Sequence, residues 1–277
     1  MEFNLPCYSL EKIYYTDGFL KDSVDATYVI HLENNGRLEH VYRQLSEYHP
    51  TDTVYILHNK GYKKCHKELE EQKPCYDLID SFLTIFRDAK QKNYNNILVL
   101  EDDFFFNHEI VKKETTESIN AFLSSKQTES FIYYLGCVPY LTVPSTGDHK
   151  RILLSTATHA CIYSKEMREI CLSVKSPTHD WDYYTNMNYK RYMYRNPLCF
   201  QVFEETENYK NWYHGYGVTS LLKAFLKYNG MDKKETVEQG FRNSYIIADW
   251  MFVFVTILIV LIVYTLYSLF LEKKENK

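Results

Sequence analysis

The chain ends in a long apolar segment, which restricts its fold more than any other feature. The 22 residues from Trp250 to Leu271 carry no formal charge and are rich in Val, Ile, Leu and Phe. A helix of this length can cross about 30 Å of hydrocarbon. The alternative is a buried core helix, but core helices rarely run so far without a polar face. The sequence therefore predicts a transmembrane helix over 250–271, a domain over 1–245 and a short charged tail over 272–277.

The orientation of this helix has to be inferred from the way it would be inserted. Positive charges are balanced on its two sides, with Lys233, Lys234 and Arg242 before it and Lys273, Lys274 and Lys277 after it. The first ten residues lack the apolar run of a secretory signal, and no N-x-S/T sequon occurs. Seven cysteines, an odd number without a C-x-x-C pair, favour free thiols. We therefore expect a single-pass C-terminal anchor with the catalytic domain in the cytosol.

Composition excludes one large class of partners. Lys and Arg together number 32 against 36 Asp and Glu, which gives a net charge of −4. Proteins that bind nucleic acid need a basic excess, because they neutralise phosphates. No nucleic-acid partner is therefore expected, and the 45% hydrophobic and 25% charged composition is that of an ordinary folded protein.

Apolar, β-branched runs alternate with helical patterns in the first hundred residues. The expected order is strand, helix, strand, helix, strand over Ala26–Leu32, Arg37–Tyr48, Thr53–His58, Tyr76–Lys92 and Asn96–Leu100. Because the last strand is apolar at every position, it is expected to be buried on both faces of a parallel sheet. The sequence thus predicts a doubly wound α/β fold with ligands at the carboxyl ends of the strands. Further strands are expected at Phe131–Leu135 and Cys161–Tyr163, and a helical region at Trp181–Arg195.

Three consecutive carboxylates, Glu101, Asp102 and Asp103, follow the apolar strand Asn96–Leu100 directly. Adjacent anions repel unless a cation lies among them, and oxygen ligands favour Mg²⁺ or Mn²⁺ over zinc. At the end of a strand, Glu101 and Asp103 point to the same face. The alternative is a solvated acidic turn that caps the next helix. A buried strand before the turn and three phenylalanines after it favour the divalent metal site.

The segment ILVLEDDFFF resembles the D-x-D-type motif of glycosyltransferase family 25, a group with the GT-A fold. Four other segments resemble motifs of this family in the same order: YVIHLENNGR, ATHACIYS, THDWDYY and PLCFQ. The similarity covers roughly residues 26–212 and is closest to short members coded by large DNA viruses. Where bacterial members carry G-x-x-x-S-H, this chain has Asp80, Ser81 and Phe82 without the histidine. The membrane segment lies outside the family pattern.

This resemblance implies transfer of a hexose from a nucleotide-diphosphate sugar to a glycan, protein or lipid acceptor. Asp103 would hold Mn²⁺ or Mg²⁺ with help from Glu101 or Asp102, and the metal would neutralise the leaving diphosphate. His214 is a possible third metal ligand. Asn34 and Arg37 would contact the nucleotide, with Arg37 binding phosphate. A surface helix residue is the alternative interpretation of Arg37.

The same resemblance suggests residues for the acceptor side. Asp180 or Asp182 would act as general base toward the acceptor hydroxyl, and His159 would lie in the cleft near the donor phosphates or metal. Carboxylates in the first turn of a helix, and a buried histidine with satisfied hydrogen bonds, are the alternatives. Two other functions compete with the transferase: a membrane-anchored binding protein that kept the fold without turnover, and a metal-dependent phosphohydrolase.

Overall fold

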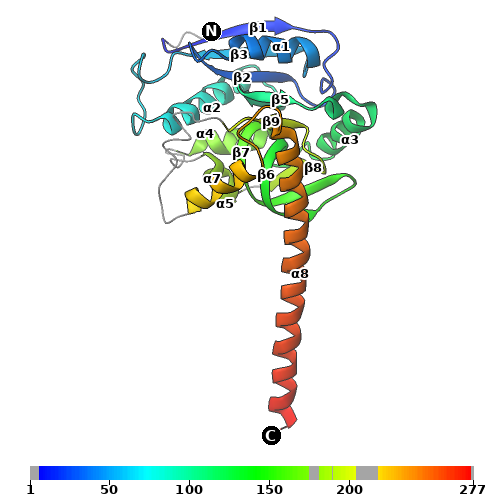
Figure 1. Cartoon of the computed structure of the whole chain (residues 1–277). Helices are drawn as coiled ribbons and strands as arrows, with labels where there is room; N and C mark the ends of the chain where they lie inside the picture. The colour runs from blue at the N-terminus through cyan, green and yellow to red at the C-terminus, as the bar shows by residue number, and fades with distance from the viewer. Residues whose placement is uncertain (1–5, 175–180, 189, 204–217, 276–277) are drawn as a thin grey trace.

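The computed structural model describes residues 6–174, 181–188, 190–203 and 218–275. Its core is a seven-stranded mixed sheet with strand order β1-β3-β2-β4-β7-β6-β8, accompanied by a two-stranded sheet of β5 and β9. One long helix projects from this domain and ends near the C-terminus (Figure 1). The chain therefore combines a mixed α/β domain with a single extended C-terminal helix.

The first half of the sheet follows the sequence prediction closely. Strands β2 (Ala26–Leu32), β3 (Thr53–Asn59) and β4 (Asn96–Glu101) are parallel and adjacent, with β2 in the middle. An unpredicted strand, β1 (Tyr8–Tyr14), pairs antiparallel with β3 at the sheet edge. The side chains of β1 alternate between buried and exposed only in part of the strand, so the sequence shows no clear two-residue period there. The carboxyl ends of the three parallel strands therefore lie side by side at the same end of the sheet.

The second half of the sheet is built on a long hairpin. Strands β6 (Phe131–Pro144) and β7 (His149–Ser164) pair antiparallel, and both are much longer than the predicted strands. The predicted helical region over 181–195 is wrong in its second part. It contains α5 (Trp181–Asn188) and then strand β8 (Lys190–Tyr194), which pairs with both β6 and β7. The tyrosines of β8 are buried against the hairpin, and this tertiary packing overrides a weak helical pattern.

Helices cover both faces of the sheet, as expected for a doubly wound fold. One core combines side chains of the parallel strands with α2 (Pro74–Gln91) and α4 (Lys165–Ser173). The other combines the alternate strand side chains with α1 (Leu38–Tyr48) and α3 (Lys113–Ser124). Because strand side chains alternate, each strand contributes to both cores. This burial explains the continuous apolar runs in the sequence.

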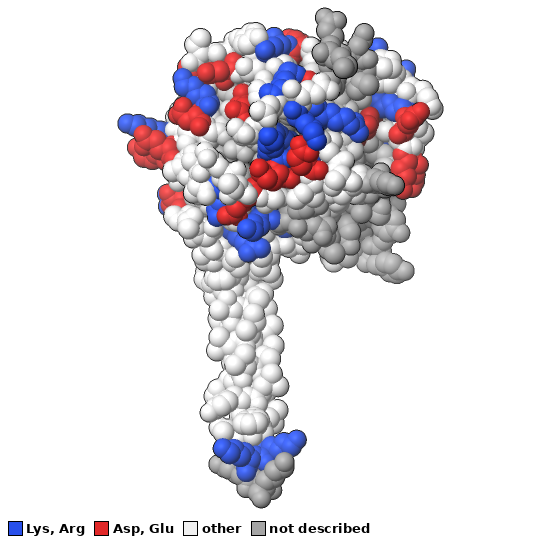
Figure 2. All heavy atoms as spheres, turned by 180° about the vertical axis from the view of Figure 1, so that it is seen from behind, with Lys and Arg blue, Asp and Glu red and all other residues white. Residues whose placement is uncertain are grey.

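The C-terminal helix α8 (Val237–Glu275) belongs partly to the domain. Its side chains Phe241, Tyr245 and Ala248 are buried, so the packed part reaches three residues beyond the predicted domain end at 245. After Asp249 the helix is exposed and, with a mean hydropathy of 2.8, is long and apolar enough to cross a membrane. Figure 2 shows no charged side chain along it until its far end. The packed part and the exposed apolar part therefore belong to one continuous helix.

A small subdomain lies between the sheet and the start of α8. Strand β5 (Phe104–Phe106), directly after the acidic turn, pairs antiparallel with β9 (Cys199–Gln201). Helix α7 (Val218–Tyr228) packs against β6, β9 and α8 through a third apolar core. The acidic turn is thus held between the main sheet and the base of α8.

Candidate active site

The acidic turn begins where β4 ends, and its middle residue, Asp102, is buried and saturated with hydrogen bonds. Its Oδ2 accepts from His31 Nδ1 at 2.9 Å, from the Leu32 backbone N–H at 3.1 Å and from Asn35 Nδ2 at 2.6 Å, while Oδ1 accepts from an Arg37 guanidinium nitrogen at 3.1 Å. Burial alone would raise the pKa of Asp102, but the hydrogen bond from His31 and the Arg37 charge outweigh it and lower the pKa. Asp102 therefore ties the loop after β2 to the end of β4.

Arg37 lies between two carboxylates of this turn. The nitrogen that donates to Asp102 also donates to Asp103 Oδ2 at 3.2 Å, and Gln201 Nε2 from β9 donates to the same oxygen at 3.4 Å. The Asn35 side chain accepts from the Arg37 backbone N–H and so fixes the loop that carries the guanidinium. The Arg37 side chain is 23% exposed. Arg37 is thus held in place by the chain while part of it stays accessible to a ligand.

Glu101 experiences the opposite electrostatic environment. Burial raises its pKa well above the ordinary value, and the negative charges of Asp103, Asp182 and Asp102 raise it further, while only Arg37 acts against them. Asp182 comes from α5, about 80 residues later, and its Oδ2 accepts from the Ala157 backbone N–H at 2.9 Å. The fold therefore gathers Glu101, Asp103 and Asp182 in one region with an excess of negative charge. Such a region favours a bound proton or cation.

The residues of this region fit a divalent cation that completes its coordination with a substrate. Within residues 6–174, 181–188, 190–203 and 218–275, no three His, Cys, Asp or Glu side chains form a ready-made coordination shell. Mg²⁺ keeps several waters and is usually bound through one or two carboxylates together with substrate phosphates. Glu101 and Asp103 can supply that protein contribution.

The sequence analysis placed His159 in the cleft, and this prediction is wrong. It is fully buried in β7, with Nε2 3.3 Å from the Cys199 carbonyl oxygen and its ring against Phe241 of α8. Burial lowers the pKa of His159 to about 4, so the ring is neutral near pH 7. The Gln201 side chain acts in the opposite direction on this pKa, and Gln201 in turn contacts Asp103. His159 is therefore a buried residue of β7 rather than a group exposed in a cleft.

The remaining predicted site residues divide into two groups. Asn34 is exposed and occupies a left-handed conformation with φ of 64°, whereas its neighbour Asn35 makes the contact with Asp102. Asp180 and His214 lie outside the described residues, so their predicted roles stay predictions. Asp182, the other candidate base, is close enough to Glu101 for its charge to raise the pKa of that residue.

The sequence reasoning missed three residues of the site: His31, Asn35 and Gln201. His31 and Asn35 lie at the end of β2 and in the loop after it, at the same sheet edge as Asp102, and the rule for strand ends could have selected them. Gln201 ends the segment PLCFQ, but its contact with Asp103 depends on the pairing of β9 with β5. That pairing joins segments almost a hundred residues apart and leaves no local pattern.

A cavity of about 320 Å³ lies at the opposite end of the parallel strands. Its lining includes Asp25 and Asn96 at the starts of β2 and β4, together with Lys21 and Lys165. None of the carboxylates of the acidic turn contributes to it. The cavity is therefore separate from the candidate active site.

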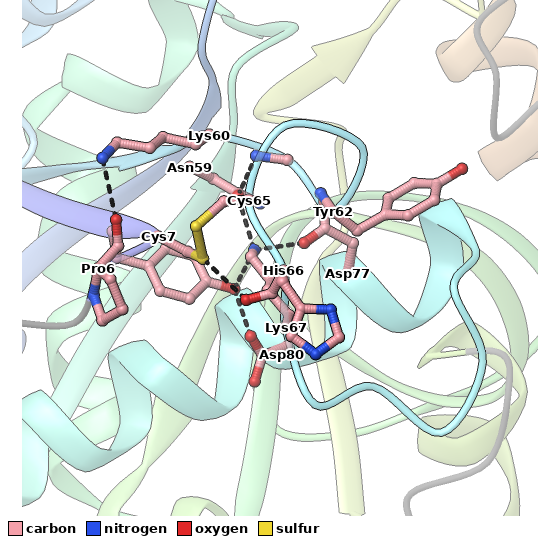
Figure 3. The surroundings of a disulfide bond; sticks show 12 residues. Pro6, Cys7, Asn59, Lys60, Tyr62, Cys65, His66, Lys67, Asp77 and Asp80 are labelled. Atoms are coloured by element: carbon pink, nitrogen blue, oxygen red, sulfur yellow. Dashed lines mark hydrogen bonds and ion pairs between the residues drawn. A yellow bond between two sulfur atoms is a disulfide. The ribbon is translucent and has the colours of Figure 1, made fainter.

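The structure corrects the expectation that all cysteines are free. Cys7 and Cys65 form a disulfide with their Cα atoms 5.5 Å apart, although 58 residues separate them (Figure 3). Cys7 immediately precedes β1 and Cys65 follows β3, and the pairing of Tyr8 with Asn59 brings the two ends together. Sequence spacing could not show this proximity. The other five cysteines form no disulfide, and four of them are buried.

A buried lysine lies beside this disulfide. Lys67 Nζ donates to the Tyr8 hydroxyl and to Asn59 Oδ1, both at 2.7 Å, and forms an ion pair with Asp77 (Figure 3). The Tyr8 hydroxyl donates to Asp80 at 2.6 Å. Burial lowers the pKa of Lys67, while the Asp77 carboxylate acts in the opposite direction. This cluster at the end of β3 carries its own cation.

No protein-family model matches the chain, and no curated protein matches it. The resemblance of five segments to glycosyltransferase family 25 therefore stays a prediction. Among solved structures, A197 from STIV is similar at 10% identity and a TM-score of 0.38, covering 65% of this chain and 86% of that one.

Two further solved structures have a similar arrangement. A glycosyltransferase involved in the glycosylation of the major capsid of PBCV-1 matches at 11% identity and a TM-score of 0.39, covering 66% of this chain and 94% of that one. An apo UDP-glucose pyrophosphorylase matches at 9% identity and a TM-score of 0.33, covering 61% and 72%. These values describe a coarse likeness in the arrangement of strands and helices. The chain itself consists of a mixed α/β domain followed by one long apolar helix.

Proposed function

We propose that this chain is a membrane-tethered glycosyltransferase that moves a hexose from a nucleotide-diphosphate sugar to a hydroxyl acceptor with the help of Mn²⁺ or Mg²⁺. The observation that carries the proposal is the convergence of Glu101, Asp103 and Asp182 beside Arg37 at the carboxyl edge of the parallel strands. This edge is the usual ligand site of such sheets. The order of motifs that resemble family 25 supports the same assignment.

Arg37 is suited to bind the donor diphosphate. Its guanidinium is partly exposed and oriented by Asp102 and Asp103. A fixed, permanently charged guanidinium makes strong charge-assisted hydrogen bonds to phosphate oxygens. Under this proposal Asp102 is a positioning residue, because its oxygens already accept four hydrogen bonds from the chain.

Glu101 and Asp103 are the residues proposed to hold the divalent cation. Burial and the neighbouring carboxylates raise the pKa of Glu101, so its ionised form is costly unless a divalent cation compensates the charge. The chemistry that the cation supplies is neutralisation of the charge that develops on the departing diphosphate. Gln201 donates to Asp103 from β9 and helps to keep it in place.

Asp182 is the proposed general base. The Ala157 backbone N–H fixes one of its oxygens, and Ala157 itself has a left-handed conformation with φ of 69°. As the acceptor oxygen bonds to the anomeric carbon, Asp182 takes the hydroxyl proton, and the bond from that carbon to the diphosphate oxygen breaks with its electron pair. A carboxylate near Glu101 is well placed for this transfer.

Release of nucleotide diphosphate from a panel of nucleotide sugars tests the proposal. The full-length protein in detergent micelles should release nucleotide from at least one donor with Mn²⁺, and EDTA should abolish the release. Glu117→Gln, on the exposed face of α3, is the matched control and should behave like the unchanged protein. If EDTA left the rate unchanged, or no donor were turned over, the proposal would be wrong.

A further inference from the structure

The point where α8 leaves the domain defines the level of the membrane surface. Ala248 is the last fully buried side chain of the helix, and Trp250 is 69% exposed. Asp249, between them, forms an ion pair of 2.5 Å with Lys150 of β7. Because tryptophan prefers the interface between lipid and water, Trp250 is placed at the headgroup level. Lys150 then lies at the same level.

The helix gives the domain little freedom to move away from this surface. No glycine or proline occurs between Phe241 and Glu275, and the structure shows a single uninterrupted helix over this span. Phe241 and Tyr245 are buried in the domain, so the packed and lipid-spanning parts are one rigid element. Kinks in helices arise mainly at proline, glycine or bulges. The base of the domain is therefore held against the bilayer.

The base of the domain exposes apolar side chains and cations beside the emerging helix. Leu153 and Leu154 of β7 are 42% and 48% exposed, and Leu221 of α7 is 73% exposed. Arg151 of the hairpin is also exposed. The β6–β7 hairpin and α7 lie at the end of the domain from which α8 projects (Figure 1), and Figure 2 shows basic side chains there with acidic ones next to them.

We propose that this base, formed by Arg151, Leu153, Leu154 and Leu221, is a second membrane contact that rests on an anionic bilayer. Exposed apolar side chains beside a cation such as Arg151 suit the headgroup region, where leucine reaches the acyl boundary and arginine binds phosphate. The bilayer is the occupant that continuity with α8 indicates, because any lipid around Trp250 also meets the base. A second copy of the chain would not be positioned by the helix in this way.

Such a contact fixes the height of the candidate active site. Asn107, just after β5, donates to Glu238 in the first turn of α8 at 3.1 Å, so the acidic turn lies near the level of that first turn. Twelve residues separate Glu238 from Trp250, and a helix rises 1.5 Å per residue, which gives about 18 Å. The site would thus be held about 18 Å above the headgroups. The contact itself does not depend on the proposed transferase activity.

Nitroxide quenching in nanodiscs tests this contact in the full-length protein. A thiol-reactive fluorophore is placed at Leu221→Cys or Leu154→Cys in a Cys75→Ser background, because Cys75 lies outside the disulfide and is not fully buried. Tyr14→Cys, on the exposed edge strand β1, and Tyr264→Cys, in the span, are the controls. The discs contain phosphatidylcholine and phosphatidylserine with a nitroxide near the headgroup or in the acyl chain.

The headgroup nitroxide should remove most of the fluorescence at positions 154 and 221 and leave position 14 unchanged. The acyl-chain nitroxide should quench position 264. Unquenched labels at 154 and 221 with a quenched label at 264 would show that the domain stands away from the bilayer, and the proposal would fall. An unquenched label at 264 would show that α8 does not cross the bilayer, and the proposal would then also be wrong. Self-quenching between copies without an effect of nitroxide lipid would assign the surface to a second copy and also overturn it.

Discussion

Two polar clusters lie at the carboxyl ends of β3 and β4, the parallel strands on either side of β2, and they differ in charge balance. At the end of β3, Lys67 neutralises Asp77 and is bonded to Tyr8 and Asn59, with a disulfide next to them. At the end of β4, Arg37 faces an excess of carboxylates, and Glu101 has a raised pKa. In the first cluster the buried Asp77 carboxylate already has a cation, whereas the second cluster favours an added positive charge.

The difference separates a structural role from a functional one within the same edge of the sheet. A buried polar cluster that satisfies its own charges stabilises a loop and needs nothing else. A cluster with unbalanced negative charge is costly unless a proton, metal or substrate compensates it. Substitutions at the two strand ends are therefore expected to affect different quantities: folding stability at β3 and turnover at β4.

Asp103→Ala should have the largest effect. The substitution removes a proposed ligand of the divalent cation, and loss of charge neutralisation on the leaving diphosphate is worth several kcal/mol, so the transfer rate should fall on the order of a thousandfold or more. The fold should survive, because one of several crowded carboxylates disappears. The measurements are transfer rate and thermal unfolding, each with Mn²⁺ and with EDTA. A variant that keeps most of its activity would make the β4 cluster an acidic turn only.

Cys7→Ser should change stability and leave the chemistry intact. Removing the disulfide releases a loop of 58 residues in the unfolded chain, and the chain-entropy estimate for a loop of this size is about 4 kcal/mol. Chemical denaturation under oxidising conditions measures the loss, and added reductant should produce the same loss in the unchanged protein. Equal stability of both proteins would mean that the bond does not form.

The same disulfide bears on the compartment of the domain. Disulfides persist in oxidising compartments and are rare in the cytosol, so the bond counts against the cytosolic placement expected from the sequence. Protease protection in intact membranes would distinguish the two orientations. Protection of the whole domain would place it on the lumenal side, and its digestion would place it in the cytosol.

Lys67→Met should destabilise the domain by about 3 kcal/mol, because it leaves Asp77 buried without its cation. The double variant Lys67→Met/Asp77→Leu should recover part of this loss, since both partners are then apolar. Turnover per folded molecule should not change in either variant. A large loss of turnover at full stability would make the β3 cluster part of the active site and remove the contrast with β4.

How much the sequence could predict depends on whether a feature is local. The strands Ala26–Leu32 and Asn96–Glu101 were found because burial on both faces leaves a continuous apolar run. The carboxylates of the acidic turn were found because they follow such a run. The different environments of these carboxylates could not be predicted, because they depend on hydrogen-bond donors at and after the end of β2 and on Asp182 of α5. The disulfide was missed for the same reason: its partners meet only through the pairing of β1 with β3.

Glu101→Gln should produce the smallest change in stability, and this change should depend on pH. The pKa of Glu101 is raised in the folded protein, because burial and the charges of Asp103 and Asp182 disfavour ionisation. Its contribution to stability is therefore complete below the unfolded pKa of about 4.3 and is lost as the pH rises through the folded pKa. Without divalent cation, the unchanged protein should lose thermal stability above that pH, whereas Glu101→Gln should lose less.

If Glu101 is a ligand, a divalent cation should offset the loss of thermal stability that the unchanged protein shows at higher pH. Mn²⁺ should raise the melting temperature of the unchanged protein more at pH 8 than at pH 5, because the metal competes with a proton for Glu101. Glu101→Gln should respond less to Mn²⁺ and lose most of this pH dependence. Asp102 does not interfere in this range, since its pKa is lowered and it titrates only in stronger acid. Identical melting curves for the two proteins at both pH values, with and without Mn²⁺, would show that the excess charge at the end of β4 does not bind a cation.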